Sequence, residues 1–225
     1  MQTLSQYIER TSSAAQILFD GLAKYRAALT EALVDPLVVS YSDDEDLKFQ
    51  TREWASVNEE AITRQKEAFT TFAAETFSQA TLAGAILQLA SAAIEQYGQC
   101  RPLGPVARKF VPPSKSQFWA GRTVRGLPLG TIILAGRNQH MHSSDEDFNP
   151  CTTTVFAHLA TAHGFAGYET TSEPGLDLAG RDRDNPLLRS FAHNILSLTG
   201  WKQPADMKKD LSDIIGSNDP ISALT

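Results

Sequence analysis

The chain has 225 residues, of which 42% are hydrophobic, and a formal net charge of −6. This size and apolar content allow a large buried core and exclude extensive disorder, and the negative charge argues against a surface that binds nucleic acid everywhere. The two cysteines lack the spacing of a disulfide framework or a metal site. The first residues do not fit a signal peptide and no apolar run is long enough to cross a bilayer, so we expect a soluble cytoplasmic protein without a membrane partner.

The first hundred residues predict long amphipathic helices. Residues 4–34 carry apolar side chains mostly at steps of three and four, and Pro36 should end this helix. A second helical pattern runs over residues 47–97, with Ser42 as the expected N-cap and acidic residues in the first turn. This pattern predicts either one very long helix or two helices with a bend within residues 78–84, where Ser and Gly weaken it.

The second half predicts shorter helices. Residues 99–128 are rich in Pro and Gly and predict an irregular connector, whose length indicates either a function or short elements within it. Residues 127–142 predict a helix of about four turns, although the apolar run also fits a buried strand. Asn149 as N-cap, Pro150 at the first position and Gly164 as the end mark the next helix. The last helices are expected at residues 186–201, after Asn185, and 204–216.

Basic residues are concentrated in the middle of the chain. Residues 96–144 contain no Asp or Glu, although an even distribution of the 26 acids would place about six there. This segment is either a solvated basic loop or a surface that binds phosphate groups, with Trp119 either stacking on bases or packing under the loop. The residues that we expect to bind RNA are Arg101, Arg108, Lys109, Lys115, Trp119, Arg122 and Arg125.

The sequence AGRNQHMHSS, residues 135–144, ends the basic segment and contains Arg137, Asn138 and His142 in the pattern R-N-x-x-x-H. Histidine titrates near neutral pH and can accept or donate a proton, whereas arginine stays charged and can bind two phosphate oxygens. These groups suit RNA cleavage without a metal. On a helix, Asn138 and His142 share a face, but Arg137 is offset from His142, so one protomer alone would build a poor site.

The motif and its helical setting resemble the HEPN superfamily. The resemblance implies an all-α bundle of long antiparallel helices in residues 1–165, with a C-terminal helical extension in residues 166–225 packed on the same domain. It also implies a metal-independent endoribonuclease of toxin or phage-defence type without a cofactor. In this role Arg137 holds the scissile phosphate, His142 transfers protons and Asn138 orients them. Such enzymes form a homodimer with one composite site, and an antitoxin or sensor protein is a further partner to consider.

Other interpretations remain open. The coiled-coil-like spacing of residues 4–34 also fits a non-catalytic helical dimerisation or adaptor module. His140, His142 and Asp145 would be the ligands of a helical metal-dependent hydrolase, although their spacing matches no common metal motif. We otherwise expect His140 to be exposed to solvent. Without a catalytic role, Arg137 is expected in a salt bridge and His142 at a helix C-terminus, where the helix dipole favours it.

Overall fold

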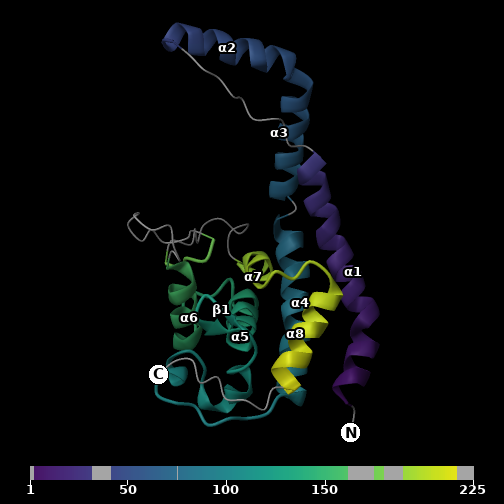
Figure 1. The fold of residues 1–225 in the computed structure, drawn as a ribbon, viewed down its shortest axis with the longest axis vertical. Coiled ribbons are helices and arrows are strands. Elements are labelled where there is room, and N and C mark those ends of the chain that lie inside the picture. The colour runs from purple at the N-terminus through teal and green to yellow at the C-terminus, as the bar shows by residue number, and fades with distance from the viewer. Residues whose placement is uncertain (1–2, 32–41, 75, 162–174, 180–189, 217–225) are drawn as a thin grey trace. The chain divides into compact units, whose positions relative to one another are not determined.

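Figure 1 shows the computed structural model of the protein, which describes residues 3–31, 42–74, 76–161, 175–179 and 190–216. These residues are mainly helical, which confirms the predicted all-α character. The chain divides into two compact units, Met1–Leu22 with Phe77–Thr225 and Ala23–Thr76. The α-helices are α1 (Leu4–Glu31), α2 (Asp44–Val57), α3 (Glu59–Ala74), α4 (Thr76–Tyr97), α5 (Leu129–Met141), α6 (Pro150–Ala160), α7 (Ala192–Thr199) and α8 (Pro204–Gly216).

Asp43, and not the predicted Ser42, is the N-cap of α2. The Asp43 carboxylate accepts hydrogen bonds from the backbone N–H groups of Glu45 and Asp46, at 3.0 and 2.9 Å. A carboxylate adds a full negative charge at the positive end of the helix dipole, which a serine hydroxyl does not. The helix buries none of its residues, and Phe49 and Val57 are 65% and 80% exposed.

The helical pattern of residues 47–97 is divided into three helices. α2 ends at Val57 with Asn58 as its C-cap, whose backbone N–H donates to the Trp54 carbonyl oxygen, and α3 ends at Ala74. The predicted bend within residues 78–84 is wrong, because α4 is continuous there. By length and composition α4 is apolar enough to cross a membrane, but 56% of that stretch is buried inside the protein, which is typical of a core helix.

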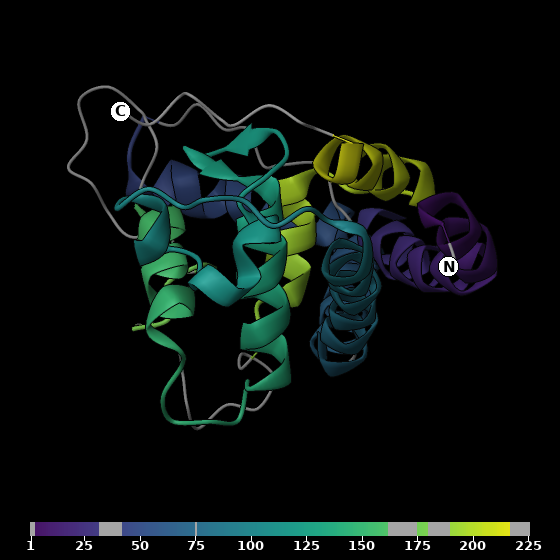
Figure 2. The ribbon, with the colours of Figure 1, turned by 90° about the horizontal axis from the view of Figure 1, so that it is seen from below.

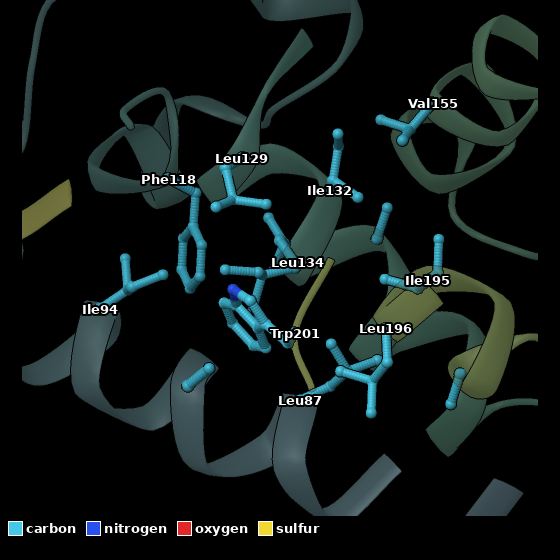
Figure 3. Close-up of a cluster of buried hydrophobic side chains, with 14 of the residues drawn as sticks. Leu87, Ile94, Phe118, Leu129, Ile132, Leu134, Val155, Ile195, Leu196 and Trp201 are labelled. Carbon is cyan, nitrogen blue, oxygen red and sulfur yellow. The ribbon is translucent and has the colours of Figure 1, made fainter. Parts of the chain in front are cut away.

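α5 lies at the centre of its unit, between α6 and α4 (Figures 1 and 2). Every residue from Leu129 to Gly136 is buried, which explains why the apolar run alone does not distinguish a helix from a buried strand. Side chains of α4, α5 and α7 meet around Trp201 in the core (Figure 3). The predicted helix at residues 127–142 is confirmed, with Pro128 preceding its first turn.

The connector between α4 and α5 contains short elements that the sequence pattern does not reveal. They are the 3-10 helices η1 (Ala107–Lys109) and η2 (Pro113–Phe118) and the antiparallel strands β1 (Thr123–Val124) and β2 (Leu127–Pro128). Arg125 and Gly126 form the turn between the strands, with φ values of 46° and 80°. Such a left-handed pair matches the twist of a two-residue hairpin, for which Gly is well suited and Arg is uncommon.

The C-terminal helices agree with the sequence in part. The Asn149 side chain accepts from the Cys151 N–H as predicted, and α6 ends at Ala160, whereas Gly164 lies outside the described residues. α7 begins at Ala192 with Phe191 as its N-cap, so the predicted continuous helix from residue 186 is wrong. Asn185 and Pro186 lie outside the described residues. α8 is confirmed, and α7 and α8 belong to the same compact unit as α4 to α6.

Candidate functional site

Arg137 and Asn138 lie in the last turn of α5, where the helix leaves the core. Arg137 Nε donates to Gln88 Oε1 of α4 at 2.8 Å, and its Nη1 donates to Asn138 Oδ1 at 3.0 Å. Both acceptors are neutral amides. Among the described residues no carboxylate neutralises the Arg137 guanidinium, although the two amides orient it. The salt bridge expected for a non-catalytic Arg137 is therefore not formed with any described residue. Hydrogens on both Nη atoms stay available to another acceptor.

His142 is the C-cap of α5 and is paired with an acid. Its Nδ1 lies 2.8 Å from Asp145 Oδ2, and the two side chains are 59% and 50% exposed. The backbone N–H of Asp145 also donates to the His142 carbonyl oxygen at 2.9 Å, so one turn holds the pair. Because a carboxylate only accepts, Nδ1 carries the hydrogen, and Nε2 of the neutral imidazole can accept a proton.

The structure does not bring Arg137 and His142 into one pocket. At 100° per residue the two side chains leave the helix about 140° apart. Arg137 and Asn138 line a pocket of about 280 Å³ between η2, α5 and the start of α6, together with Lys115, and His142 is not part of its wall. Within one protomer the motif is therefore split between a pocket and an exposed helix end.

His140 is half-buried, and the expectation that it is exposed to solvent is wrong. Its Nδ1 lies 2.8 Å from the Ser190 hydroxyl, and its ring packs against Gly84 so closely that a Cβ there would overlap it. Burial lowers the pKa of His140. Gly84, which only weakened a helical pattern in the sequence, therefore makes room for an imidazole.

The three residues considered as metal ligands do not converge. His140 contacts Ser190, whereas His142 contacts Asp145. In the part of the chain that the structure describes, no three His, Cys, Asp or Glu side chains are grouped so that they could hold a metal ion.

Arg122 and Arg125, two of the expected RNA-binding residues, bind to the protein itself. Arg122 donates from Nε and Nη2 to the Asp210 carboxylate, at 3.0 and 3.1 Å, and Asp210 also accepts from Trp201 Nε1 at 2.7 Å. Arg125 Nη1 donates to the Leu159 carbonyl oxygen at the end of α6 at 2.7 Å. These contacts join the hairpin to α8 and to α6, so both side chains have a structural role.

The other expected RNA-binding residues differ in exposure. Arg108 and Lys109 of η1 are exposed, whereas Arg101 is half-buried. Lys115 forms an ion pair with Glu95, with Nζ 2.6 Å from Oε1. Trp119 is half-buried and stacks on Phe110, with ring centroids 6.2 Å apart, as the packing alternative predicts.

Two side chains that contact the motif residues Arg137 and His142 were not predicted as their partners from the sequence. Gln88 is 49 residues from Arg137 and no local signal links them. Asp145 follows His142 by three residues, and the turn that brings this imidazole and carboxylate together is not specified by the sequence pattern.

Comparisons of the chain with known proteins found no match among protein-family models, curated proteins or solved structures. The chemistry of the side chains described above is therefore the basis for a functional assignment.

Proposed function

We propose that the protein is a metal-independent endoribonuclease of toxin or phage-defence type that acts as a HEPN-like homodimer. One observation carries this proposal. The end of α5 presents an oriented guanidinium that contacts no carboxylate among the described residues, and an exposed imidazole whose Nδ1 is held by Asp145. A fixed cation and a side chain that can accept and donate a proton are what phosphodiester cleavage without a metal requires.

Each residue has a distinct task in the proposed reaction. His142 Nε2 accepts the proton of the ribose 2′-hydroxyl, whose oxygen attacks the phosphorus. Arg137 donates from its Nη atoms to the phosphate oxygens as negative charge develops on them. The bond to the 5′-oxygen then breaks and this oxygen takes up a proton, which gives a 2′,3′-cyclic phosphate and a 5′-hydroxyl. Asn138 acts as a positioning residue, because its Oδ1 holds Nη1 of Arg137.

A dimer explains how separated groups act on one bond. Because Arg137 and His142 point in different directions, a second copy of α5 would supply the complementary group and a second imidazole as the acid. Met141, next to His142, is 58% exposed and offers an apolar contact for such a partner.

The test is cleavage of total RNA in EDTA by the wild-type protein, His142→Ala and the neighbouring control Ser144→Ala. We expect wild type and Ser144→Ala to cleave, and His142→Ala to be slower by about 100-fold or more. Equal cleavage by wild type and His142→Ala would overturn the proposal. Activity that disappears in EDTA would instead indicate a metal-dependent enzyme.

A specific observation favours the adaptor module as the second candidate. α2 buries no residue and exposes Phe49 and Val57, as a helix does when its apolar side chains contact another protein. We would compare the mass in solution of the wild-type protein and Phe49→Ser. A smaller particle for Phe49→Ser, together with no RNA cleavage by wild type, would favour this candidate.

A further inference from the structure

The pocket beside Arg137 has features that the cleavage mechanism does not use. It has a volume of about 280 Å³ and is formed by η2 and the residues before it, α5 and the first turn of α6. Its apolar wall includes Phe110, Leu134 and Ala135, and its polar wall includes Lys115, Arg137 and Asn138. This volume lies just below the range of small-molecule sites, about 300–1,000 Å³, and fits one phosphate group with its sugar.

The charges in this wall favour an anion. Arg137 and Lys115 are both cationic, and no acid belongs to the lining in the part of the chain that the structure describes. Lys115 also pairs with Glu95, but the two side chains are 39% and 35% exposed, so this ion pair is weak and leaves further N–H donors on the ammonium group. The N-terminal turn of α6, with Asn149, Cys151 and Thr152 in the wall, adds the positive end of a helix dipole.

We infer that the pocket formed by Lys115, Arg137, Asn138 and the first turn of α6 binds a phosphate group, carried either by RNA next to the scissile bond or by a free nucleotide. The guanidinium and the ammonium contact the phosphate oxygens, and Phe110 with Leu134 contacts the attached sugar or base. This inference rests on the proposed function, because Arg137 belongs to both the pocket and the proposed catalytic site. A binding experiment tests the pocket independently of RNA cleavage.

Cys151 provides a reporter inside the pocket. Cys151 is one of the residues that line the pocket and is half-buried, whereas the other cysteine, Cys100, is exposed and lies outside the lining. Burial raises the pKa of Cys151, so alkylation with iodoacetamide has to be followed at alkaline pH. Mass spectrometry then measures the alkylation rates of Cys151 and Cys100 in one sample, with Cys100 as the internal control.

The experiment uses full-length His142→Ala with three ligands: inorganic phosphate, adenosine monophosphate and a short single-stranded RNA. We expect a saturating ligand to slow alkylation of Cys151 by about tenfold and to leave Cys100 unchanged, since a ligand in a pocket covers its walls. Protection by RNA alone would identify an RNA phosphate as the ligand, and protection by phosphate or the mononucleotide would identify a free one.

A matched pair of variants tests the charge requirement. Lys115→Ala should weaken protection by the mononucleotide about tenfold, whereas Lys209→Ala, which removes the same charge from an exposed position of α8, should not change it. The inference is overturned if none of the ligands protects Cys151, or if Lys115→Ala binds like wild type. If wild type cleaves RNA but no ligand protects Cys151, the phosphate-binding pocket is overturned and the proposed nuclease activity stands. If a ligand protects Cys151 but wild type does not cleave RNA, the nuclease activity is overturned and the pocket stands.

Discussion

Replacing Arg122 by alanine separates a structural role of this side chain from a role in binding RNA. The guanidinium donates two hydrogen bonds to the Asp210 carboxylate and one to the Thr199 carbonyl oxygen. The Asp210 side chain is 8% exposed, so in Arg122→Ala it keeps the bond from Trp201 Nε1 but loses its counter-ion in a place that water reaches poorly.

The expected loss of stability follows from this burial. Removing one partner of a buried ion pair costs about 3–5 kcal/mol. The Arg122 side chain is 46% exposed, so water can partly replace it, which lowers the estimate to about 2 kcal/mol. For a chain of this length, that corresponds to a fall of about 6 °C in the thermal midpoint.

Lys109→Ala is the matched comparison, because it removes one positive charge from an exposed residue of the same basic segment. Thermal unfolding and RNA binding below the midpoint are measured for both variants. We expect Arg122→Ala to lose stability and retain RNA binding, and Lys109→Ala to retain stability within about 0.5 kcal/mol and to bind RNA more weakly, with a smaller dependence on salt. If Arg122→Ala is as stable as wild type and binds RNA less well, Arg122 contributes to RNA binding and not to stability.

Three further predictions concern the end of α5. Asp145→Asn weakens the acceptor that holds His142 Nδ1 and should slow RNA cleavage about tenfold without changing the thermal midpoint, and an unchanged rate would exclude Asp145 from the site. Burial lowers the pKa of His140, so below pH about 6.5 the unfolded chain binds more protons at this residue than the folded protein does. The contribution of His140 to stability is therefore complete above that pH and is lost as the pH falls through the folded pKa. Urea unfolding at neutral and acidic pH measures this loss of stability, and His140→Gln should reduce it. If His140→Gln has the same pH dependence as wild type, the loss does not come from His140. Gly84→Ala should destabilise the protein by about 1 kcal/mol, since the new methyl group overlaps the His140 ring, although alanine is the better helix former. With His140→Ala in the background, the same change should stabilise by up to about 1 kcal/mol, and destabilisation in both backgrounds would rule out the overlap as its cause.

The helical composition of the chain and several helix ends could be predicted from the sequence. Apolar periodicity acts along one element, and a cap such as Asn149 acts on backbone groups of the next turn, so both can be found within a few residues. The same local signals were ambiguous where neighbouring residues compete, as at Ser42 and Asp43, and where a helix is buried on all sides, as in α5.

Only the tertiary structure decided which polar side chains are available for chemistry. Arg122 is held by a carboxylate 88 residues later, and His140 by Gly84 and a serine 50 residues later. Arg137 is oriented by a glutamine of α4 and shares a pocket with Lys115. Each of these contacts depends on how separate elements pack. Because the partner lies far along the chain, the sequence around each residue contains no signal of the contact.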